Sequence, residues 1–181
     1  RQPSPGCQST NRSGGAVDEE EAGAALPTLG MAGAEHLGLV VQQGPGVVAT
    51  CDLRPYGDED HEWWVASDLS ELATRQPLRE DHVLGIGGAS TTLASWTPRP
   101  RVARALDLGT GCGVQALHLA THSTSVVATD VNPRALWITR FNTALNGVAD
   151  RVEVRDGSFF EPVRGERYDL IATNPPFVIS P

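Results

Sequence analysis

The alternation of strand and helix patterns from about residue 103 onward constrains the fold of this chain more than any other feature. Short apolar runs are typical of strands in a parallel sheet, and longer runs with apolar residues three and four apart are typical of helices. Strands and helices are predicted in turn for the segments RALDLG, VQALHLATH, SVVATD, NPRALWITRFNTALNG, RVEVR and YDLIATN. This order, with a loop before the last strand, predicts an α/β fold with a parallel sheet and right-handed crossovers.

The second predicted helix carries a full set of start and stop signals. Asn132 can cap its start, Pro133 fits the first helical position, and Gly147 fits a left-handed exit. Its apolar residues recur at spacings of three and four, which predicts one apolar face. They are Ile138, Phe141 and Leu145.

The third predicted strand, RVEVR, alternates charged and apolar residues, whereas the other three strands are more nearly continuous in apolar character. Central strands of a parallel sheet are buried on both faces, and edge strands need not be. We therefore place the third strand at an edge and predict the local strand order 3-2-1-4.

The chain before residue 101 divides into two segments. Residues 1–35 are rich in Gly, Pro, Ser and Ala, and are predicted to be a mobile arm or linker. Residues 36–100 are predicted to be rich in β-structure, with a hairpin around QQGPG and a strand at EWWVASDL. Trp63 and Trp64 would point to opposite faces of that strand, one in the core and one partly exposed, although a substrate platform is an alternative. Residues 101–181 form the third segment.

The composition of the chain limits which binding partners and which cellular compartment are expected for it. The net charge is −8 and the pI about 5.0, which disfavours nonspecific binding to nucleic-acid phosphates. The three cysteines are far apart, which is typical of a protein of the reducing cytoplasm. No Cys/His cluster has the spacing of a metal site, so no metal is predicted. No apolar run approaches the roughly 18 residues of a membrane span.

A glycine-rich loop, LDLGTGCGVQAL, joins the first strand of the alternating region to its first helix. Its glycines permit a tight turn and close approach of a ligand to the backbone, and they are Gly109, Gly111 and Gly113. The spacing is GxGxG, whereas the dinucleotide fingerprint GxGxxG has a third glycine where this chain has Val114. Asp107 precedes the loop, and a carboxylate repels a pyrophosphate but attracts an ammonium or sulfonium group. The loop therefore favours a cationic ligand over NAD.

Two further carboxylates follow the second and third strands. Asp130 could accept hydrogen bonds from both hydroxyls of a ribose, and Asp156 could accept one from the amine of an adenine. Asp107 and Asp156 also have purely structural interpretations, because Asp107 could cap a turn and Asp156 could open one. All three fall just past the carboxyl ends of parallel strands, where such folds bind ligands, so that together they favour a nucleoside site.

These motifs resemble the class I S-adenosylmethionine-dependent methyltransferases, which have a Rossmann-like fold. Within that class the chain resembles the branch whose fourth strand ends in [N/D]-P-P-[Y/F/W], which includes the release-factor glutamine methyltransferases and the methyltransferases of adenine and guanine amines in RNA and DNA. The resemblance covers about residues 103–179 and rests on LDLGTGCG, VVATDVNPRAL, DGSFFEP and YDLIATNPPF.

The resemblance implies roles for individual residues. The glycines and Thr110 would pass under the cofactor S-adenosyl-L-methionine, with Asp107 facing its methionine end. Asp130 would hold the ribose, and Val131 would pack on the adenine. The residues that would lie at the adenine amine are Asp156, Gly157 and Ser158, with Phe159 alongside.

The NPPF stretch would hold the substrate nitrogen. An amide or aniline-like nitrogen is a poor nucleophile because its lone pair is delocalised. The side-chain oxygen of Asn174 and the carbonyl of Pro175 could accept its two N–H bonds and direct the lone pair at the methyl group. Pro175 and Pro176 restrict the backbone, and Phe177 would stack on the planar group of the substrate. The sequence therefore predicts N-methylation of a planar nitrogen, with Asn174, Pro175, Pro176 and Phe177 as catalytic residues.

Two departures from the family leave the substrate and the extent of the protein open. The segment before the methyltransferase region is predicted as β, whereas release-factor methyltransferases carry a helical domain there. The family also has three further strands after NPPF, and only four residues follow Phe177. We expect a fragment of the enzyme, or a partner chain that completes the sheet, and no competent methylation by this chain alone. The substrate would be RNA, DNA or a protein such as a release factor; the alternatives are a noncatalytic cofactor-binding module and an NAD-dependent oxidoreductase.

Overall fold

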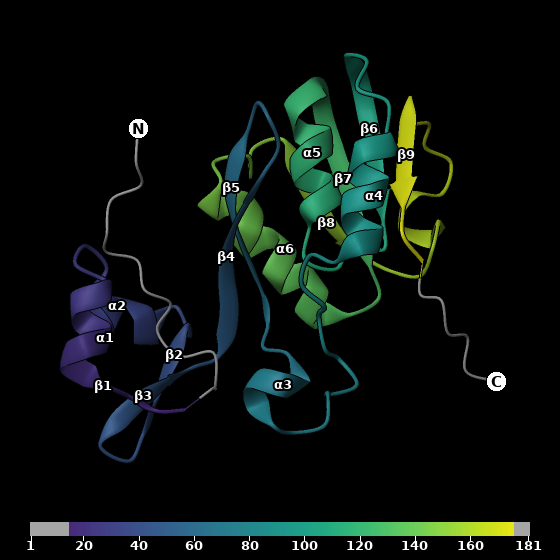
Figure 1. Ribbon diagram of the computed structural model, residues 1–181. Helices are drawn as coiled ribbons and strands as arrows, with labels where there is room; N and C mark the ends of the chain where they lie inside the picture. Colours follow the sequence, from purple (N-terminus) through teal and green to yellow (C-terminus); the bar gives the residue numbers. More distant parts are fainter. Residues whose placement is uncertain (1–14, 176–181) are drawn as a thin grey trace. The chain divides into compact units, whose positions relative to one another are not determined.

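A computed structural model describes residues 15–175 (Figure 1). The chain forms two compact units, one of Arg1–Asp52 with Leu69–Leu78 and one of Leu53–Asp68 with Arg79–Pro181. This division differs from the predicted segments, because strand β5 (Glu62–Asp68) hydrogen-bonds to a helix of the alternating region and so belongs with it. The chain passes between the units within strand β4 (Cys51–Gly57), after Asp68 and after Leu78.

The first unit contains a small antiparallel sheet. Its strands β1 (Val17–Asp18), β2 (Val40–Gln43) and β3 (Gly46–Ala49) are ordered β1-β3-β2. The β2–β3 pair confirms the predicted hairpin, since Gln43 pairs with Gly46 across a turn in which Gly44 has φ +62°. The short helix α3 (Glu71–Thr74) also belongs to this unit, and the side chain of Ser70 caps its start.

The prediction of a mobile arm is wrong for the described part of residues 1–35. After β1, the helices α1 (Glu19–Ala25) and α2 (Gly30–His36) follow in succession. The Asp18 carboxylate accepts hydrogen bonds from the backbone N–H groups of Glu20 and Glu21, which caps α1. The acidic residues of the first helical turn, Glu19, Glu20 and Glu21, interact favourably with the helix dipole.

A four-stranded parallel sheet forms the centre of the second unit. Its strands are β6 (Val102–Leu108), β7 (Ser123–Asp130), β8 (Val152–Asp156) and β9 (Leu170–Thr173). The order β8-β7-β6-β9 confirms the predicted order 3-2-1-4. Helix α5 (Val114–His122) connects β6 to β7, and α6 (Pro133–Leu145) connects β7 to β8. A 3-10 turn, η1 (Glu161–Val163), precedes β9.

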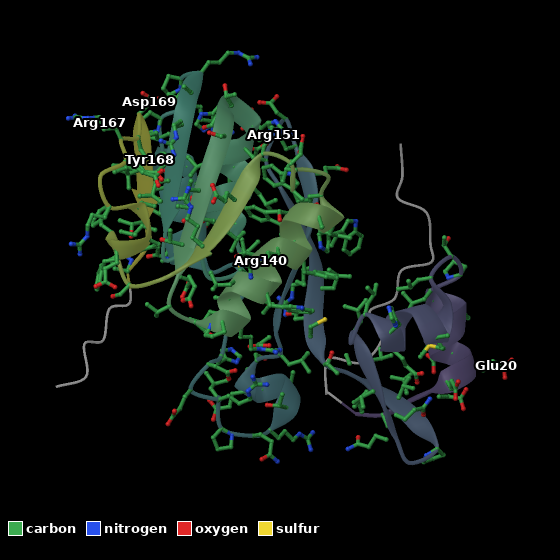
Figure 2. All side chains as sticks on the ribbon, turned by 180° about the vertical axis from the view of Figure 1, so that it is seen from behind. Glu20, Arg140, Arg151, Arg167, Tyr168 and Asp169 are labelled. Atoms are coloured by element: carbon green, nitrogen blue, oxygen red, sulfur yellow. The ribbon has the colours of Figure 1, made fainter. Side chains whose placement is uncertain are left out.

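The side chain of Asp169 fixes the register between β6 and β9. Its carboxylate accepts hydrogen bonds from the backbone N–H groups of Ala103 and Arg104, at 3.0 and 2.9 Å. Figure 2 labels Asp169 immediately before β9 and Arg151 immediately before β8, at the amino ends of these strands. With this register Leu108 pairs with Thr173, so that both strands end together.

Alternation along β6 separates the two faces of the parallel sheet. Ala105 packs in the larger core with residues of α5 and α6, whereas Leu106 and Leu108 pack on the other face with Val127 and Val163. Helix α5 packs on β6 and β7, and α6 packs on β7, β8 and the hairpin strand β5. Helix α4 (Gly88–Trp96) packs on α5 (Figure 1).

The hairpin of β4 and β5 adds aromatic side chains to the larger core. Trp63 is 7% exposed and Trp64 52% exposed, which confirms that the two rings point to opposite faces. The ring of His61 stacks on Trp63, and His118 of α5 meets Trp63 edge-on. Because Trp63 is packed on both sides, it is a core residue and not a substrate platform.

The buried face of α6 differs from its predicted apolar face. Ile138 is buried, but Leu145 is 46% exposed and Phe141 is only partly buried. Polar residues take their place, and the buried residues are Ala135, Leu136, Ile138, Thr139, Asn142 and Thr143. The capping signals are confirmed: the Asn132 side chain accepts from the N–H of Arg134, and Gly147 has φ +68°.

Within residues 15–175, no helix combines the length and apolar character that crossing a bilayer requires.

Candidate functional site

The carboxyl ends of the four parallel strands meet at one edge of the sheet. Leu108 pairs with both Thr129 and Thr173, and Asp130 pairs with Asp156. The residues that follow these positions are the glycine loop, Val131, Gly157 and Asn174. The structure thus brings together the described site residues that the sequence predicted, at the edge where open parallel sheets bind ligands.

The glycine loop adopts a conformation that requires glycine. Gly109, Gly111 and Gly113 have φ values of +75°, +57° and +80°, in the left-handed region. A Cβ atom on Gly109 or Gly111 would meet no heavy atom within 4 Å, whereas one on Gly113 would lie 3.1 Å from the Thr139 side chain. Gly113 is therefore needed for packing on α6, and the first two glycines leave open space beside the backbone.

Asp107 lies beneath this loop and is 1% exposed. Its Oδ2 accepts hydrogen bonds from the Thr110 hydroxyl at 2.6 Å and from the N–H of Ala116 at 3.0 Å. Burial raises the pKa of the Asp107 carboxyl to about 7, although both hydrogen bonds act to lower it. These contacts agree with the alternative that Asp107 organises a turn, and its position beside a methionine group remains a prediction.

Asp130 joins the end of β7 to the glycine loop. Its Oδ2 accepts a hydrogen bond from the N–H of Gly111, and its Oδ1 accepts one from the N–H of Asn132, both at 2.9 Å. The carboxylate remains partly exposed. The loop and the predicted ribose-binding carboxylate are thus in direct contact, and the bond to a ribose remains a prediction.

The turn after β8 presents exposed side chains beside Asp130. Asp156 is exposed, and the N–H of Gly157 donates to the carbonyl of Asp130 at 3.0 Å. Gly157 has φ +148°, and a Cβ there would lie 2.9 Å from Pro162. Val131 and Phe159 expose more than half of their surface. These residues give the edge two carboxylates flanked by apolar side chains.

The NPPF stretch begins directly at the end of β9. The hydroxyl of Thr173 donates to the carbonyl of Leu108 at 2.9 Å, which ties the strand end to the residue before Gly109. Asn174 is partly buried and Pro175 is exposed. Pro176 and Phe177 lie outside the described residues. Asn174 and Pro175 therefore follow the strand end nearest the glycine loop, as the sequence predicted.

Two polar residues of α6 also hold the loop, and sequence reasoning missed both. The Thr139 hydroxyl donates to the carbonyl of Gly111 at 3.1 Å, and the Asn142 amide donates to the carbonyl of Cys112 at 2.7 Å. The signal was available, because Thr139 and Asn142 are three residues apart and polar residues at helical spacing share a face. Loop carbonyls are thus held by α6, and the Gly111 N–H is held by Asp130.

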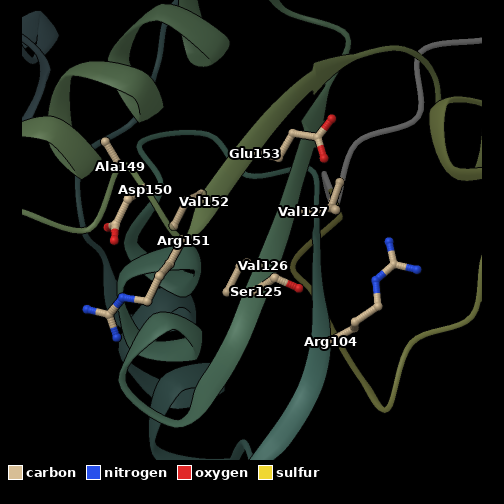
Figure 3. Close-up of a pocket in the computed structure, with 9 residues that line it drawn as sticks. All are labelled: Arg104, Ser125, Val126, Val127, Ala149, Asp150, Arg151, Val152 and Glu153. Atoms are coloured by element: carbon tan, nitrogen blue, oxygen red, sulfur yellow. The ribbon is translucent and has the colours of Figure 1, made fainter.

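A hollow at the opposite end of the sheet contains none of the predicted residues (Figure 3). It lies near the amino ends of β6, β7 and β8, and Arg104, Ser125, Arg151 and Glu153 contribute to its lining. Acidic and basic side chains are mixed there, so the hollow has no single charge to select a ligand. The carboxyl edge remains the better candidate.

Comparisons with known proteins identify relatives of this arrangement. Residues 85–180 match the family described as the methyltransferase small domain. The chain is 40% identical over 83 residues to a release factor glutamine methyltransferase of Aquifex aeolicus, and the match covers 45% of this chain and 30% of that protein. It is 37% identical over 97 residues to a tRNA1(Val) (adenine(37)-N6)-methyltransferase of Parabacteroides distasonis, covering 52% of this chain and 41% of that protein.

Among solved structures, a 16S rRNA methyltransferase of T. thermophilus in complex with AdoMet and guanosine shares the fold. The TM-score is 0.56 at 20% identity, and the match covers 94% of this chain and 49% of that one. The chain spans less than half of the length of each of these three relatives.

Proposed function

The chain belongs to the methyltransferase small domain family, and on that premise we propose that it carries the cofactor-binding edge of an S-adenosylmethionine-dependent N-methyltransferase. The observation that carries the proposal is the convergence of Asp107, Asp130, Asp156 and Asn174 at the carboxyl ends of four neighbouring strands. This shared edge supports a single ligand site formed by all four residues.

The described residues fit a positively charged nucleoside. Among residues 15–175, neither Asp130 nor Asp156 forms an ion pair, so their negative charge is available to a ligand. The backbone at Gly109 and Gly111 has open space on the side where a Cβ would stand. We propose that Asp130 holds the ribose hydroxyls, that Asp156 with Gly157 and Ser158 holds the adenine amine, and that Val131 covers one face of the ring. S-adenosylmethionine, when bound, supplies an electrophilic methyl group on a sulfonium.

Asn174 and Pro175 would select and orient the substrate nitrogen. The side-chain oxygen of Asn174 and the carbonyl of Pro175 are acceptors, and a planar primary amine has two N–H donors to satisfy. Accepting both bonds holds the nitrogen in one orientation, which lowers the barrier by positioning. A strong base is not required, because the nitrogen loses its proton readily once it has become cationic. Phe177 would stack on the planar group of the substrate.

The substrate class follows from the relatives' names. One is named for glutamine of a release factor and another for an adenine of tRNA. Both substrates present a planar NH₂ group, which is the feature that Asn174 and Pro175 would recognise. We propose that this chain acts on such a nitrogen in a protein or an RNA. A cytoplasmic location remains a prediction.

The proposal is tested by calorimetric titration of the chain with S-adenosylhomocysteine and, separately, with NADH. S-adenosylhomocysteine should bind and NADH should not. Tighter binding of NADH would replace the proposal with a nicotinamide-dependent oxidoreductase.

A pair of glycine variants assigns the binding to the loop. Gly111→Ala places a methyl group in the open space of the site, at φ +57°. Gly147→Ala introduces similar backbone strain, at φ +68°, where a Cβ also meets no atom within 4 Å. Gly111→Ala should weaken S-adenosylhomocysteine binding by about tenfold or more, and Gly147→Ala should leave it unchanged. If both variants weakened S-adenosylhomocysteine binding equally, the proposal that the glycine loop binds the cofactor would be wrong.

A further inference from the structure

Helix α6 carries two asparagines, Asn142 and Asn146, that hydrogen-bond to the backbone of β5. The Asn142 amide accepts from the N–H of Ala66 and donates to the carbonyl of Ala66, both at 2.8 Å. The Asn146 amide accepts from the N–H of Trp64 at 3.0 Å and donates to the carbonyl of Trp64 at 2.8 Å. Each side chain therefore pairs with one strand residue as a neighbouring strand would.

The spacing explains why a helix can replace a strand here. Four residues of a helix rise about 6 Å, and two residues of a strand advance about 6.7 Å. Asn142 and Asn146 therefore meet alternate residues of β5, whose other edge pairs with β4. An amide has both a donor and an acceptor, so it can satisfy both backbone groups of an edge residue.

Asn142 differs from Asn146 in a third contact. Its amide also donates to the carbonyl of Cys112 in the glycine loop, at 2.7 Å, and the side chain is 0% exposed. Asn146 instead donates to the carbonyl of Asn142 within α6, also at 2.7 Å. Asn142 is thus the member of the pair that joins the β4–β5 hairpin to the loop.

The Cys112 carbonyl is a sensitive point of that loop. Gly111 and Gly113 flank Cys112, and both have positive φ. The peptide plane between Cys112 and Gly113 is held at both of its polar groups, because the Gly113 N–H donates to the Thr110 carbonyl at 2.8 Å and the Cys112 carbonyl accepts from Asn142. The hydrogen bond from Asn142 favours one orientation of this plane, and the bond from Thr139 to the Gly111 carbonyl holds the preceding plane.

We propose that Asn142 is a positioning residue for the cofactor, which selects the binding conformation of the glycine loop and makes the β4–β5 hairpin part of the cofactor site. This inference rests on the proposed function for the identity of the ligand. A purely structural role for Asn142 would affect the stability of the fold but would leave the affinity of the folded chain for S-adenosylhomocysteine unchanged.

The two asparagines give a matched pair of variants. Asn142→Asp and Asn146→Asp each keep an acceptor for the β5 N–H and remove the donors. Asn142→Asp should weaken S-adenosylhomocysteine binding by about tenfold, which equals ~1.4 kcal/mol, and Asn146→Asp by less than about twofold. Binding is measured by calorimetry at a temperature at which both variants are folded, as judged by circular dichroism.

Nuclear magnetic resonance of the wild-type chain tests the same inference without a variant, in case Asn142→Asp does not fold. The side-chain NH₂ resonances of Asn142 should shift when S-adenosylhomocysteine binds, whereas those of Asn146 should not. The inference is overturned if the ligand shifts the Gly111 amide while Asn142 stays unchanged, or if both variants lose the same affinity. If the wild-type chain binds no S-adenosylhomocysteine, the proposed function fails and the inference fails with it.

Discussion

Asp130 and Glu166 are both acidic residues of the second unit that connect separate elements, but they are compensated in different ways. Glu166 accepts from Arg104 and from Arg155, each at 2.5 Å, and from the Tyr168 hydroxyl at 3.0 Å. We call these four residues the Glu166 network. Asp130 accepts only backbone N–H groups among the described residues, those of Gly111 and Asn132.

This difference indicates that the charge of Glu166 stabilises the fold, whereas the charge of Asp130 is a candidate for binding a ligand. In the Glu166 network the carboxylate lies within hydrogen-bond distance of two guanidinium groups, and Arg155 also pairs with Glu153, so the negative charge of Glu166 is compensated by its neighbours. At the carboxyl edge, Asp130 and Asp156 lie together without an ion pair among the described residues, whereas Asp107 is buried beneath the loop. An uncompensated group of carboxylates beside an open loop attracts a cation, which is the property that an ammonium or sulfonium ligand requires.

The largest expected effect is on turnover at Asn174. Asn174→Ala removes one of the two proposed acceptors for the substrate nitrogen, so methylation should fall by about 10²- to 10³-fold. Binding of S-adenosylhomocysteine should persist, because Asn174 follows β9 and is not among the residues proposed to hold the nucleoside. The effect is measured as transfer of a radiolabelled methyl group from the cofactor to cell extract, with a form of the protein that is active as a methyltransferase. Unchanged turnover would remove Asn174 from the catalytic residues.

The next effect contrasts the two kinds of carboxylate directly. Asp130→Asn retains the shape of the side chain but removes its charge and one acceptor, so S-adenosylhomocysteine should bind about 10- to 100-fold more weakly. Glu166→Gln makes the same chemical change within the Glu166 network and should leave the affinity unchanged. Calorimetry on both variants checks the contrast, and equal affinities would show that the carboxyl edge has no special role.

Asp107 should make the folded state less stable as the pH rises, whereas a carboxylate with a lowered pKa has the opposite effect. Burial raises its pKa from the usual 3.8 to about 7, so between these values the folded state holds a proton that the unfolded state has lost. Its contribution is therefore complete below about pH 3.8 and decreases as the pH rises to about 7. Urea unfolding over this range should show a shallower decrease in Asp107→Asn than in the wild type. Parallel profiles would mean that Asp107 is ionised throughout.

The smallest effect is expected from the Glu166 network. Hydrogen bonds from Arg155, Arg104 and Tyr168 lower the pKa of Glu166 from 4.5 to about 2. The network therefore stabilises the fold above pH 4.5 and loses this contribution as the pH falls toward 2. Because these side chains are only partly buried, Glu166→Gln should change the midpoint of thermal unfolding only slightly at pH 7, and raising the salt concentration should reduce the difference further. A large shift at high salt would contradict a screened surface network.

The parallel sheet could be predicted from the sequence because its signals are local. Continuous apolar runs mark β6, β7 and β9, the alternation of β8 marks an edge, and Asn132, Pro133 and Gly147 delimit α6. The order of the strands could be predicted from which strands are expected to be buried on both faces. The positions of the site residues could be predicted because each follows the end of a strand. Local patterns were sufficient here because strand direction places every carboxyl end at one edge.

Contacts between segments distant in sequence could not be predicted. Asn142 is polar, so the search for an apolar face did not include it, yet it is buried because it bonds to Ala66, 76 residues away, and to Cys112. Residues 1–35 were predicted to be a mobile arm or linker from their composition, although the side chain of Asp18 caps the helix α1. In both cases the burial or order of a polar group depends on a partner that composition does not reveal.

The most direct test of the account maps where S-adenosylhomocysteine binds on the folded chain. In amide resonance spectra, the account predicts shifts at Gly109, Gly111, Val131 and Gly157, and none at Ser125, Arg151 and Glu153 of the opposite hollow. Shifts concentrated around that hollow, or a spectrum that the ligand leaves unchanged, would contradict the claim that the carboxyl edge binds the nucleoside of the cofactor.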